Sequence, residues 1–143
     1  MHEIRPARPE DAPALERLLG ELGFPTPAAT VAIRLSALLE ASEIVLVALC
    51  DREVVGLLTG HVTPVLHRPT PVGRITALVV AERVRNQGIG RALVVAAERT
   101  LSDRGCGLVE VTSNRRLTAA HAFYERIGYE VTSVRFKKEI PRG

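Results

Sequence analysis

The sequence predicts an α/β fold in which one mixed sheet is layered with helices. Its 143 residues are enough for one hydrophobic core but too few for two, so residues 1–143 are expected to form a single domain. Apolar residues recur at the period of a strand in some segments and at the period of a helix in others. Glycine and proline clusters separate those segments. Together these observations predict the order β-α-α-β-β-β-α-β-α-β.

The first half of the chain provides a strand, two helices and a hairpin. Residues 2–7 form a short strand candidate, and a helix with carboxylates in its first turn follows as far as Gly23. A second amphipathic helix is expected over 27–41. The apolar run 44–50 and the segment 53–63 are expected to pair as a hairpin. This half therefore supplies three strands and two helices.

The second half alternates strands and helices after a loop. Three prolines and a glycine make residues 64–73 that loop. After it, apolar patterning and glycine stops predict, in order, a strand over 75–80, a helix that ends near 104, a strand over 108–112, a helix over 117–127 and a final strand over 129–140.

The strand over 75–80 leads into a glycine-containing turn that opens a helix. Gly88 and Gly90 lie in this turn, and the helical spacing of apolar residues begins at Ile89. The first N–H groups of a helix have no intrahelical partner, and the helix dipole places positive charge there. Glycine lets the backbone approach a phosphate without a Cβ between them. The arrangement therefore predicts an anion site.

Two common phosphate loops do not fit this turn. A P-loop requires a lysine after its second glycine, and the first lysine of the chain is Lys137. A Rossmann turn requires a third glycine or an alanine where this chain has Leu93. The segment Arg85–Gly90 instead resembles the R/Q-x-x-G-x-G/A signature of the GNAT superfamily of N-acetyltransferases. In that superfamily the loop holds the pyrophosphate of acetyl-CoA.

A second segment strengthens this resemblance. Residues 120–129, AHAFYERIGY, resemble the A-x-x-F/L-Y-e-x-x-G-F/Y signature of the same superfamily. The predicted order of elements is also the order of the GNAT fold. The resemblance therefore implies a mixed, mostly antiparallel sheet of six to seven strands with about four helices.

The resemblance also implies an enzyme that moves an acetyl group from acetyl-CoA to a primary amine of a small molecule or peptide, by direct attack in a ternary complex. In the family a tyrosine protonates the departing thiolate, and Tyr124 matches it. A phenol with an ordinary pKa of about 10 stays protonated at neutral pH, as an acid must. The main chain of the strand before the loop bonds the pantetheine arm in the family. The residues expected to bind the cofactor are Leu78, Val79, Val80, Arg85, Asn86, Gln87, Gly88, Ile89, Gly90, Arg91, Asn114 and Tyr124.

The general base is not found by this comparison. Many family members place a glutamate where this chain has Thr76, which cannot remove a proton at neutral pH. His61 and His67 are the remaining titratable candidates. The amine could instead lose its proton to water. Simpler roles stay open for two other residues: Tyr124 could anchor its helix to the sheet, and Asn114 could form a turn.

Two other functions compete with the enzyme that the resemblance implies. A catalytically weak acyl-CoA-binding sensor is the alternative function, because Thr76 replaces the glutamate. A formal charge of +3 with only three Phe and two Tyr gives little support to nucleic-acid binding. No histidine, cysteine and carboxylate cluster has metal-ligand spacing. No apolar run has membrane-spanning length, and the N-terminus lacks a signal-peptide pattern, so a cytoplasmic location without membrane attachment is expected. A homodimer stays open.

Overall fold

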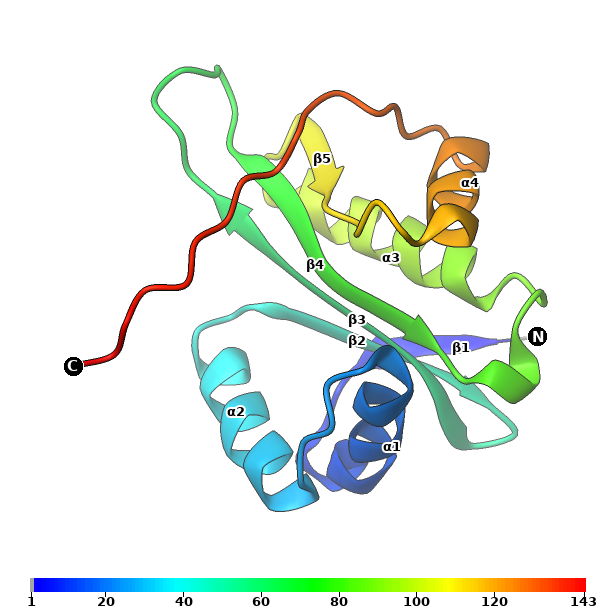
Figure 1. Cartoon of the computed structure of the whole chain (residues 1–143). Helices are drawn as coiled ribbons and strands as arrows, with labels where there is room; N and C mark the ends of the chain where they lie inside the picture. The colour runs from blue at the N-terminus through cyan, green and yellow to red at the C-terminus, as the bar shows by residue number, and fades with distance from the viewer. Residues whose placement is uncertain (1) are drawn as a thin grey trace. The chain divides into compact units, whose positions relative to one another are not determined.

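A computed structural model describes residues 2–143 (Figure 1). The chain divides into two compact units, one ending at Val111 and the other running from Thr112 to Gly143. The first contains the sheet and three of the four α-helices, and the second contains the fourth.

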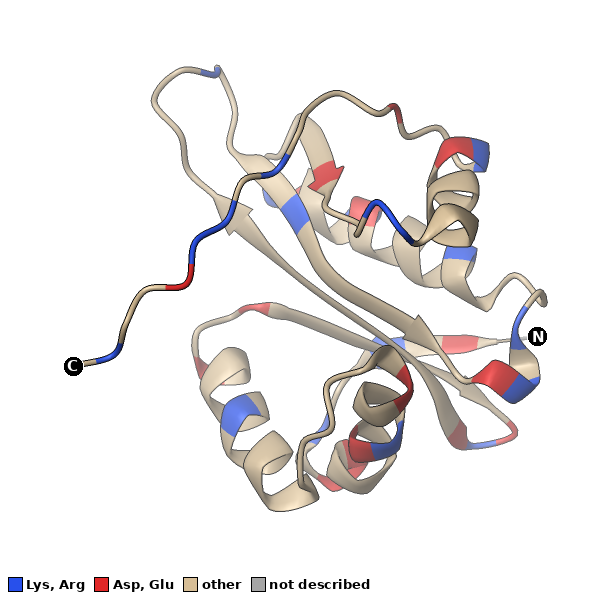
Figure 2. Ribbon diagram, viewed as in Figure 1, with Lys and Arg blue, Asp and Glu red and all other residues tan. Residues whose placement is uncertain are grey.

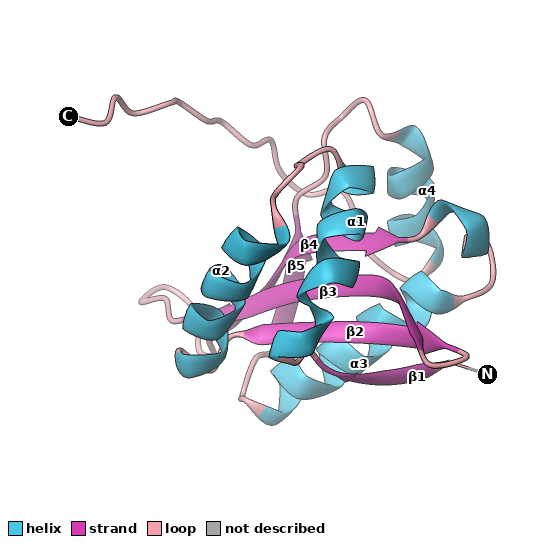
Figure 3. Ribbon diagram, turned by 90° about the horizontal axis from the view of Figure 1, so that it is seen from below, coloured by secondary structure: helices cyan, strands magenta, loops and turns pink. Residues whose placement is uncertain are grey.

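The first unit is built on a five-stranded sheet with the strand order β1-β2-β3-β4-β5 (Figures 1 and 3). Neighbouring strands are antiparallel except for β4 and β5, which are parallel. Residues 44–49 of β2 are all buried because helices cover the sheet on both faces. The strands are β1 (Glu3–Pro6), β2 (Ile44–Cys50), β3 (Glu53–Thr63), β4 (Val72–Val80) and β5 (Leu108–Val111).

Three α-helices and two short 3-10 turns complete the first unit. Helices α1 (Ala12–Leu22) and α2 (Ala28–Glu40) cover one face of the sheet, and α3 (Ile89–Asp103) covers the other (Figures 1 and 3). The 3-10 turn η1 (Pro9–Asp11) precedes α1, and η2 (Glu82–Val84) follows β4. Charged residues gather on the helices and turns, while the middles of β2 and β3 have none (Figure 2).

Helix α3 packs closely against the sheet because glycines face it. Its apolar stripe includes Leu93 and Leu101, both fully buried. A Cβ at Gly56 would lie 3.0 Å from a Leu93 methyl, and one at Gly73 would lie 2.8 Å from a Leu101 methyl. A side chain at either position would face α3, so the two glycines leave room for the leucines of that helix.

Strand β4 contains a bulge that changes which residues face α3. Thr59 pairs with Ala77 and Gly60 pairs with Ile75, so Thr76 is left between the two pairs without a partner. Because the bulge adds one residue, Thr76 and Ala77 both turn away from α3. Their face of the sheet is the one that α1 and α2 partly cover.

The second unit contains α4 (Thr118–Arg126) and no strand within residues 112–143. The predicted strand over 129–140 is therefore wrong, and the sheet has five strands rather than six to seven. The apolar residues Val131, Val134 and Phe136 do not keep a strict two-residue period, and all three are exposed. Without a buried face or a neighbouring strand, little offsets the entropy lost on ordering such a segment.

The other predicted elements are confirmed to within a few residues. The order of the remaining strands and helices is as expected, and residues 2–143 contain four α-helices. In the part of the chain that the structure describes, no helix is both long enough and apolar enough to span a membrane.

Candidate acetyl-CoA and acceptor site

The turn between η2 and α3 has the backbone shape of an anion cradle. Asn86 and Gly88 adopt positive φ values of 64° and 81°, and left-handed residues in such a turn can bring successive N–H groups into one concavity that binds an anion. The first hydrogen bond of α3 runs from the Ala92 N–H to the Gly88 carbonyl oxygen at 3.0 Å. The N–H groups of Ile89, Gly90 and Arg91 are therefore left for an anion at the positive end of the helix dipole.

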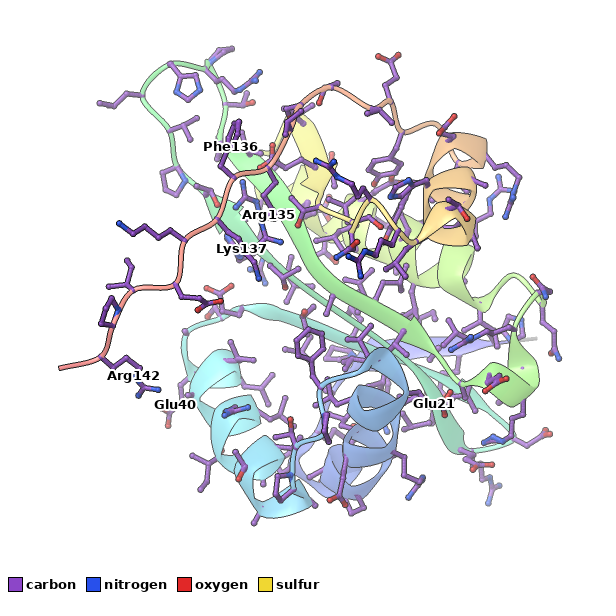
Figure 4. All side chains as sticks on the ribbon, viewed as in Figure 1. Glu21, Glu40, Arg135, Phe136, Lys137 and Arg142 are labelled. Carbon is purple, nitrogen blue, oxygen red and sulfur yellow. The ribbon has the colours of Figure 1, made fainter. Side chains whose placement is uncertain are left out.

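Three side chains hold this cradle in place. The Arg85 Nε donates to the Val80 carbonyl oxygen at 3.0 Å. Glu21 extends from α1 (Figure 4), and its Oε1 accepts a hydrogen bond from the Glu82 N–H at 2.8 Å. The ring of His2 donates from Nε2 to the Gln87 carbonyl oxygen at 3.0 Å. These three contacts hold the loop in one conformation, and a binding site ordered in this way loses little entropy when a ligand binds.

The second half of β4 has a strand on one edge only. Strand β5 pairs with β4 over Val72–Ile75 and goes no further. Beyond Ile75, within the first unit, β3 is the remaining strand partner of β4. The sheet therefore opens just before the cradle, as a pantetheine arm would require.

The register identifies the main-chain groups on this open edge. The Ala81 N–H donates to the Val55 carbonyl oxygen at 2.8 Å, so the groups of Ala81 point toward β3. Alternation along an antiparallel ladder turns Val79 toward β3 as well. The N–H and C=O groups of Leu78 and Val80 then point to the open edge. Leu78 and the N–H of Val80, rather than Val79, therefore supply main-chain groups for a ligand on this edge, since the Val80 carbonyl oxygen already accepts from Arg85.

A line of polar residues crosses the sheet on the face turned away from α3. His61 of β3 is the register partner of Arg74 of β4, and Arg74 is the partner of Glu110 of β5. The Arg74 Nε donates to Glu110 Oε1 at 2.9 Å, and the Arg74 Nη2 pairs with the same oxygen. Next to this line, at the bulge of β4, the hydroxyls of Thr59 and Thr76 lie 2.7 Å apart.

The two histidine candidates for the general base lie in different settings. His61 is half-buried on β3, on the face that also presents the bulge. His67 lies exposed in the loop between β3 and β4. Glu110 was not among the predicted site residues, because its partner Arg74 lies 36 residues earlier in the chain. Only the strand register reveals that they meet.

The predicted residues of the second unit lie in and before α4. Asn114 forms the turn that precedes this helix: its Oδ1 accepts from the Arg116 N–H at 2.9 Å, and its carbonyl oxygen accepts from the Leu117 N–H at 2.9 Å. The His121 Nε2 donates to the same carbonyl oxygen at 2.8 Å. The turn-forming role of Asn114 is therefore present in the structure.

Tyr124 is held between two other aromatic rings. Its ring makes edge-to-face contacts with Phe123 and Tyr129, at centroid distances of 5.2 and 5.8 Å. The Tyr129 N–H also donates to the Tyr124 carbonyl oxygen at 2.9 Å. Burial raises the pKa of the Tyr124 phenol, so the phenol stays neutral and able to donate a proton over a wider pH range.

Residues 2–143 contain no group of three His, Cys, Asp or Glu side chains placed to hold a metal ion. The candidate site is accordingly made of backbone amides, a guanidinium, hydroxyls and imidazoles. These groups suit the binding of an anion and the transfer of a proton.

Comparison with known proteins shows which family this chain resembles. A family model described as the acetyltransferase (GNAT) family matches residues 10–129. An aminoalkylphosphonate N-acetyltransferase of Salmonella typhimurium is 38% identical over 93 residues, which are 65% of this chain and 60% of that relative. The chain thus spans less than two thirds of that relative's length.

Solved structures share the fold over nearly the whole chain. A structure titled a transcriptional regulator from Bacillus halodurans C-125 has a TM-score of 0.87 and 25% identity, and covers 98% of this chain and 100% of that one. The aminoglycoside N-acetyltransferase AAC(6')-Iy in complex with CoA has a TM-score of 0.86 at 18% identity, with 97% and 95% covered. Since the family model spans most of its length, this chain belongs to the GNAT family of acetyltransferases.

Proposed function

We propose that this chain is an N-acetyltransferase that moves the acetyl group of acetyl-CoA to a primary amine of a small molecule or peptide. GNAT acetyltransferases use acetyl-CoA as the acetyl donor. The observation that best supports the proposal is the open edge of β4, which leads directly into the N–H groups at the start of α3. We also propose that residues 1–143 act as one domain, because the family model extends across both compact units.

The cradle fits a pyrophosphate chemically and sterically. A Cβ at Gly88 would meet no heavy atom within 4 Å, so the space beside the loop is open. The proposed ligands of the pyrophosphate are the main-chain N–H groups from Gln87 to Arg91, helped by the side chains of Arg85 and Asn86. The pantetheine arm would bond the main chain at Leu78 and Val80, alongside Val79. Asn114 is retained as a further contact to the cofactor.

The proposed chemistry is direct transfer in a ternary complex. When bound, acetyl-CoA supplies an activated thioester carbonyl. The neutral acceptor amine attacks that carbon, and an N–H on the open edge, at Leu78 or Val80, stabilises the oxyanion. Tyr124 then donates its phenolic proton to the departing thiolate. This role suits a half-buried phenol whose pKa burial has raised.

For the general base, His61 is the better of the two histidine candidates. It lies on the face of the sheet that presents the Thr76 bulge, whereas His67 lies in an exposed loop. An ordinary imidazole has a pKa of about 6.5 and can accept a proton at neutral pH. Thr76 cannot do so, and its hydroxyl is already paired with that of Thr59. Loss of the amine proton to water is the alternative.

The acceptor is proposed to be a small-molecule amine. The relative of 38% identity is named for aminoalkylphosphonates, and these are the first acceptors to test. The second candidate function, an acyl-CoA sensor without turnover, is favoured only by Thr76 at the position of the usual glutamate.

A transfer assay separates these functions. The purified chain is mixed with acetyl-CoA and a panel of primary amines, and both free CoA thiol and N-acetylated product are measured. We expect both to appear in equal amounts with at least one amine. Tight acetyl-CoA binding without product from any amine would favour the sensor. Absence of acetyl-CoA binding by calorimetry would overturn both functions.

A further inference from the structure

His61, Arg74 and Glu110 form a polar row across the sheet. The proposed acetyl transfer gives no role to the guanidinium of Arg74 or to the carboxylate of Glu110. Its three residues are register neighbours on adjacent strands, so their Cα atoms succeed one another at roughly 5 Å across the sheet. The row lies one step before the Thr76 bulge, on the same face of the sheet.

Glu110 uses only some of the hydrogen-bond donors of Arg74. Of its five N–H donors, the one on Nε and one on Nη2 are directed at a single oxygen of Glu110. Among the described residues, no other side chain or carbonyl bonds this guanidinium. The Nη1–Nη2 edge therefore keeps the paired donors that recognise a carboxylate or phosphonate in a bidentate manner. The side chain is 45% exposed, so a ligand can reach it.

Glu110 also keeps binding capacity. Arg74 contacts Oε1, and the second carboxylate oxygen is not part of that pair. An Arg–Glu pair is neutral overall, so it gives little attraction to a simple anion or a simple cation. It is complementary to a molecule that has both charges a few bonds apart, because each charge meets its opposite. An amino acid or an aminoalkylphosphonate is such a molecule.

We propose that Arg74 is the specificity-determining residue of the acceptor site and binds an oxyacid group on the acceptor. Glu110 orients the acceptor's ammonium group, and the adjacent His61 takes its proton before attack. The inference rests on the proposed acetyl transfer and narrows its acceptors to short-chain amines that bear an acid group. A carboxylate and a phosphonate share the required chemistry.

Three amines of similar length test this inference: 2-aminoethylphosphonate, β-alanine and n-propylamine. For the unsubstituted chain we expect kcat/KM to be about 10- to 100-fold higher with at least one acid than with n-propylamine, as one charge-assisted contact allows. The ratio between the two acids tells which oxyacid the site prefers. Equal turnover of all three amines would overturn the inference and leave acetyl transfer standing. Turnover of none would overturn both.

Variants assign the effect to Arg74. Arg74→Gln should lower kcat/KM for the preferred acid by about 10- to 100-fold and should not lower it comparably for n-propylamine, which has no acid group for Arg74 to bind. Arg74→Lys should give an intermediate loss of kcat/KM, since lysine keeps the positive charge but lacks the two parallel N–H donors of the guanidinium. Glu110→Gln should lower KM for the acid, because Arg74 is no longer neutralised, while lowering kcat. The control is Arg52→Gln, at an exposed arginine in the β2–β3 turn.

Folding is monitored separately in each variant. Acetyl-CoA affinity and the thermal midpoint should match those of the unsubstituted chain in Arg74→Gln, since Arg74 lies outside the cradle. A uniform loss with all three amines at unchanged acetyl-CoA affinity would contradict the specificity role. Loss confined to the acids would support it.

Discussion

The Arg85 guanidinium donates from Nε to the carbonyl oxygen of Val80 over 3.0 Å. This bond joins the first residue of the cradle to the last residue of β4, so the loop is fixed to the open edge of the sheet. Arg85 Nη2 also lies 3.8 Å from the Glu21 carboxylate, a distance at which an exposed pair contributes little. The carbonyl contact is therefore the stronger of the two restraints.

Replacing Arg85 by alanine should weaken acetyl-CoA binding. The substitution removes the tie to Val80 and a cation beside the pyrophosphate, and the loss of one charge-assisted hydrogen bond predicts a Kd about 10-fold higher. Calorimetric titration measures this directly. Arg83→Ala is the control, because Arg83 pairs with Glu53 at 2.7 Å on the surface. Equal Kd values for the two variants would contradict the role given to Arg85.

Gly88→Val should abolish acetyl-CoA binding while the chain still folds. The positive φ of 81° costs an L-residue about 1–2 kcal/mol, and the new side chain would project into the open space of the cradle. Gly105→Val is a matched control, since Gly105 has a φ of 91° and also no neighbour within 4 Å of a built Cβ.

Both glycine variants should lose a similar free energy of unfolding in urea. Only Gly88→Val should lose affinity for acetyl-CoA in calorimetry. If Gly105→Val lost the same affinity, the effect would arise from backbone strain rather than from a blocked cradle.

Asp11→Asn should destabilise the first unit and remove an acid-sensitive contribution to its stability. Asp11 is 5% exposed, accepts two hydrogen bonds from Arg5 at 2.8 and 2.9 Å, and accepts a third from the Arg8 N–H at 2.7 Å. Losing one partner of such a pair costs about 3 kcal/mol. Urea unfolding at pH 7 measures this loss.

The pH dependence of that loss has a definite sign. The Arg5 hydrogen bonds lower the pKa of Asp11 below its ordinary 3.8, against the opposing effect of burial. Its contribution is therefore present above about pH 3.8 and declines as pH falls through the lower, folded value. The difference in stability between Asp11→Asn and the unsubstituted chain should shrink below that pH. A constant difference from pH 7 to pH 2 would contradict this coupling.

Much of the fold was predictable because its signals are local. Strand and helix periods and glycine stops place β1 to β5 and the four α-helices of residues 2–143 within a few residues of where they occur. The cradle was predictable for the same reason, since Arg85 to Gly90 are consecutive in the sequence. The lack of a strand over 129–140 was not predictable from local signals, because a strand forms only beside another strand, and the sequence does not specify that partner.

The missing features of the site all depend on contacts distant in sequence. The bulge at Thr76 follows from the register between β3 and β4, which no local pattern of the β4 sequence specifies. Glu21 meets the Glu82 N–H from 61 residues away, and Arg74 meets Glu110 from 36 residues away. The direction in which the main-chain N–H and C=O groups of Val79 point can likewise be found only from the pairing between β3 and β4. Sequence motifs predict the cradle, whereas tertiary structure is needed to find what surrounds it.

Tyr124→Phe tests the proposed acid. The change removes one hydroxyl and keeps the edge-to-face contacts with Phe123 and Tyr129, so folding and acetyl-CoA affinity should be nearly unchanged. Loss of a general acid predicts a fall in kcat of about 100-fold. A steady-state assay of thiol release with a competent amine measures kcat, and calorimetry measures affinity.

The pH profile distinguishes proton donation from positioning of the sulfur. Because burial raises the pKa of Tyr124, the active protonated phenol should persist past pH 10, the ordinary value for tyrosine. The alkaline fall in kcat caused by its ionisation should therefore begin above that pH in the unsubstituted chain and be absent from Tyr124→Phe. A phenol that only positions sulfur predicts a smaller fall in kcat. Identical kcat values and identical pH profiles in the two proteins would exclude Tyr124 as the acid.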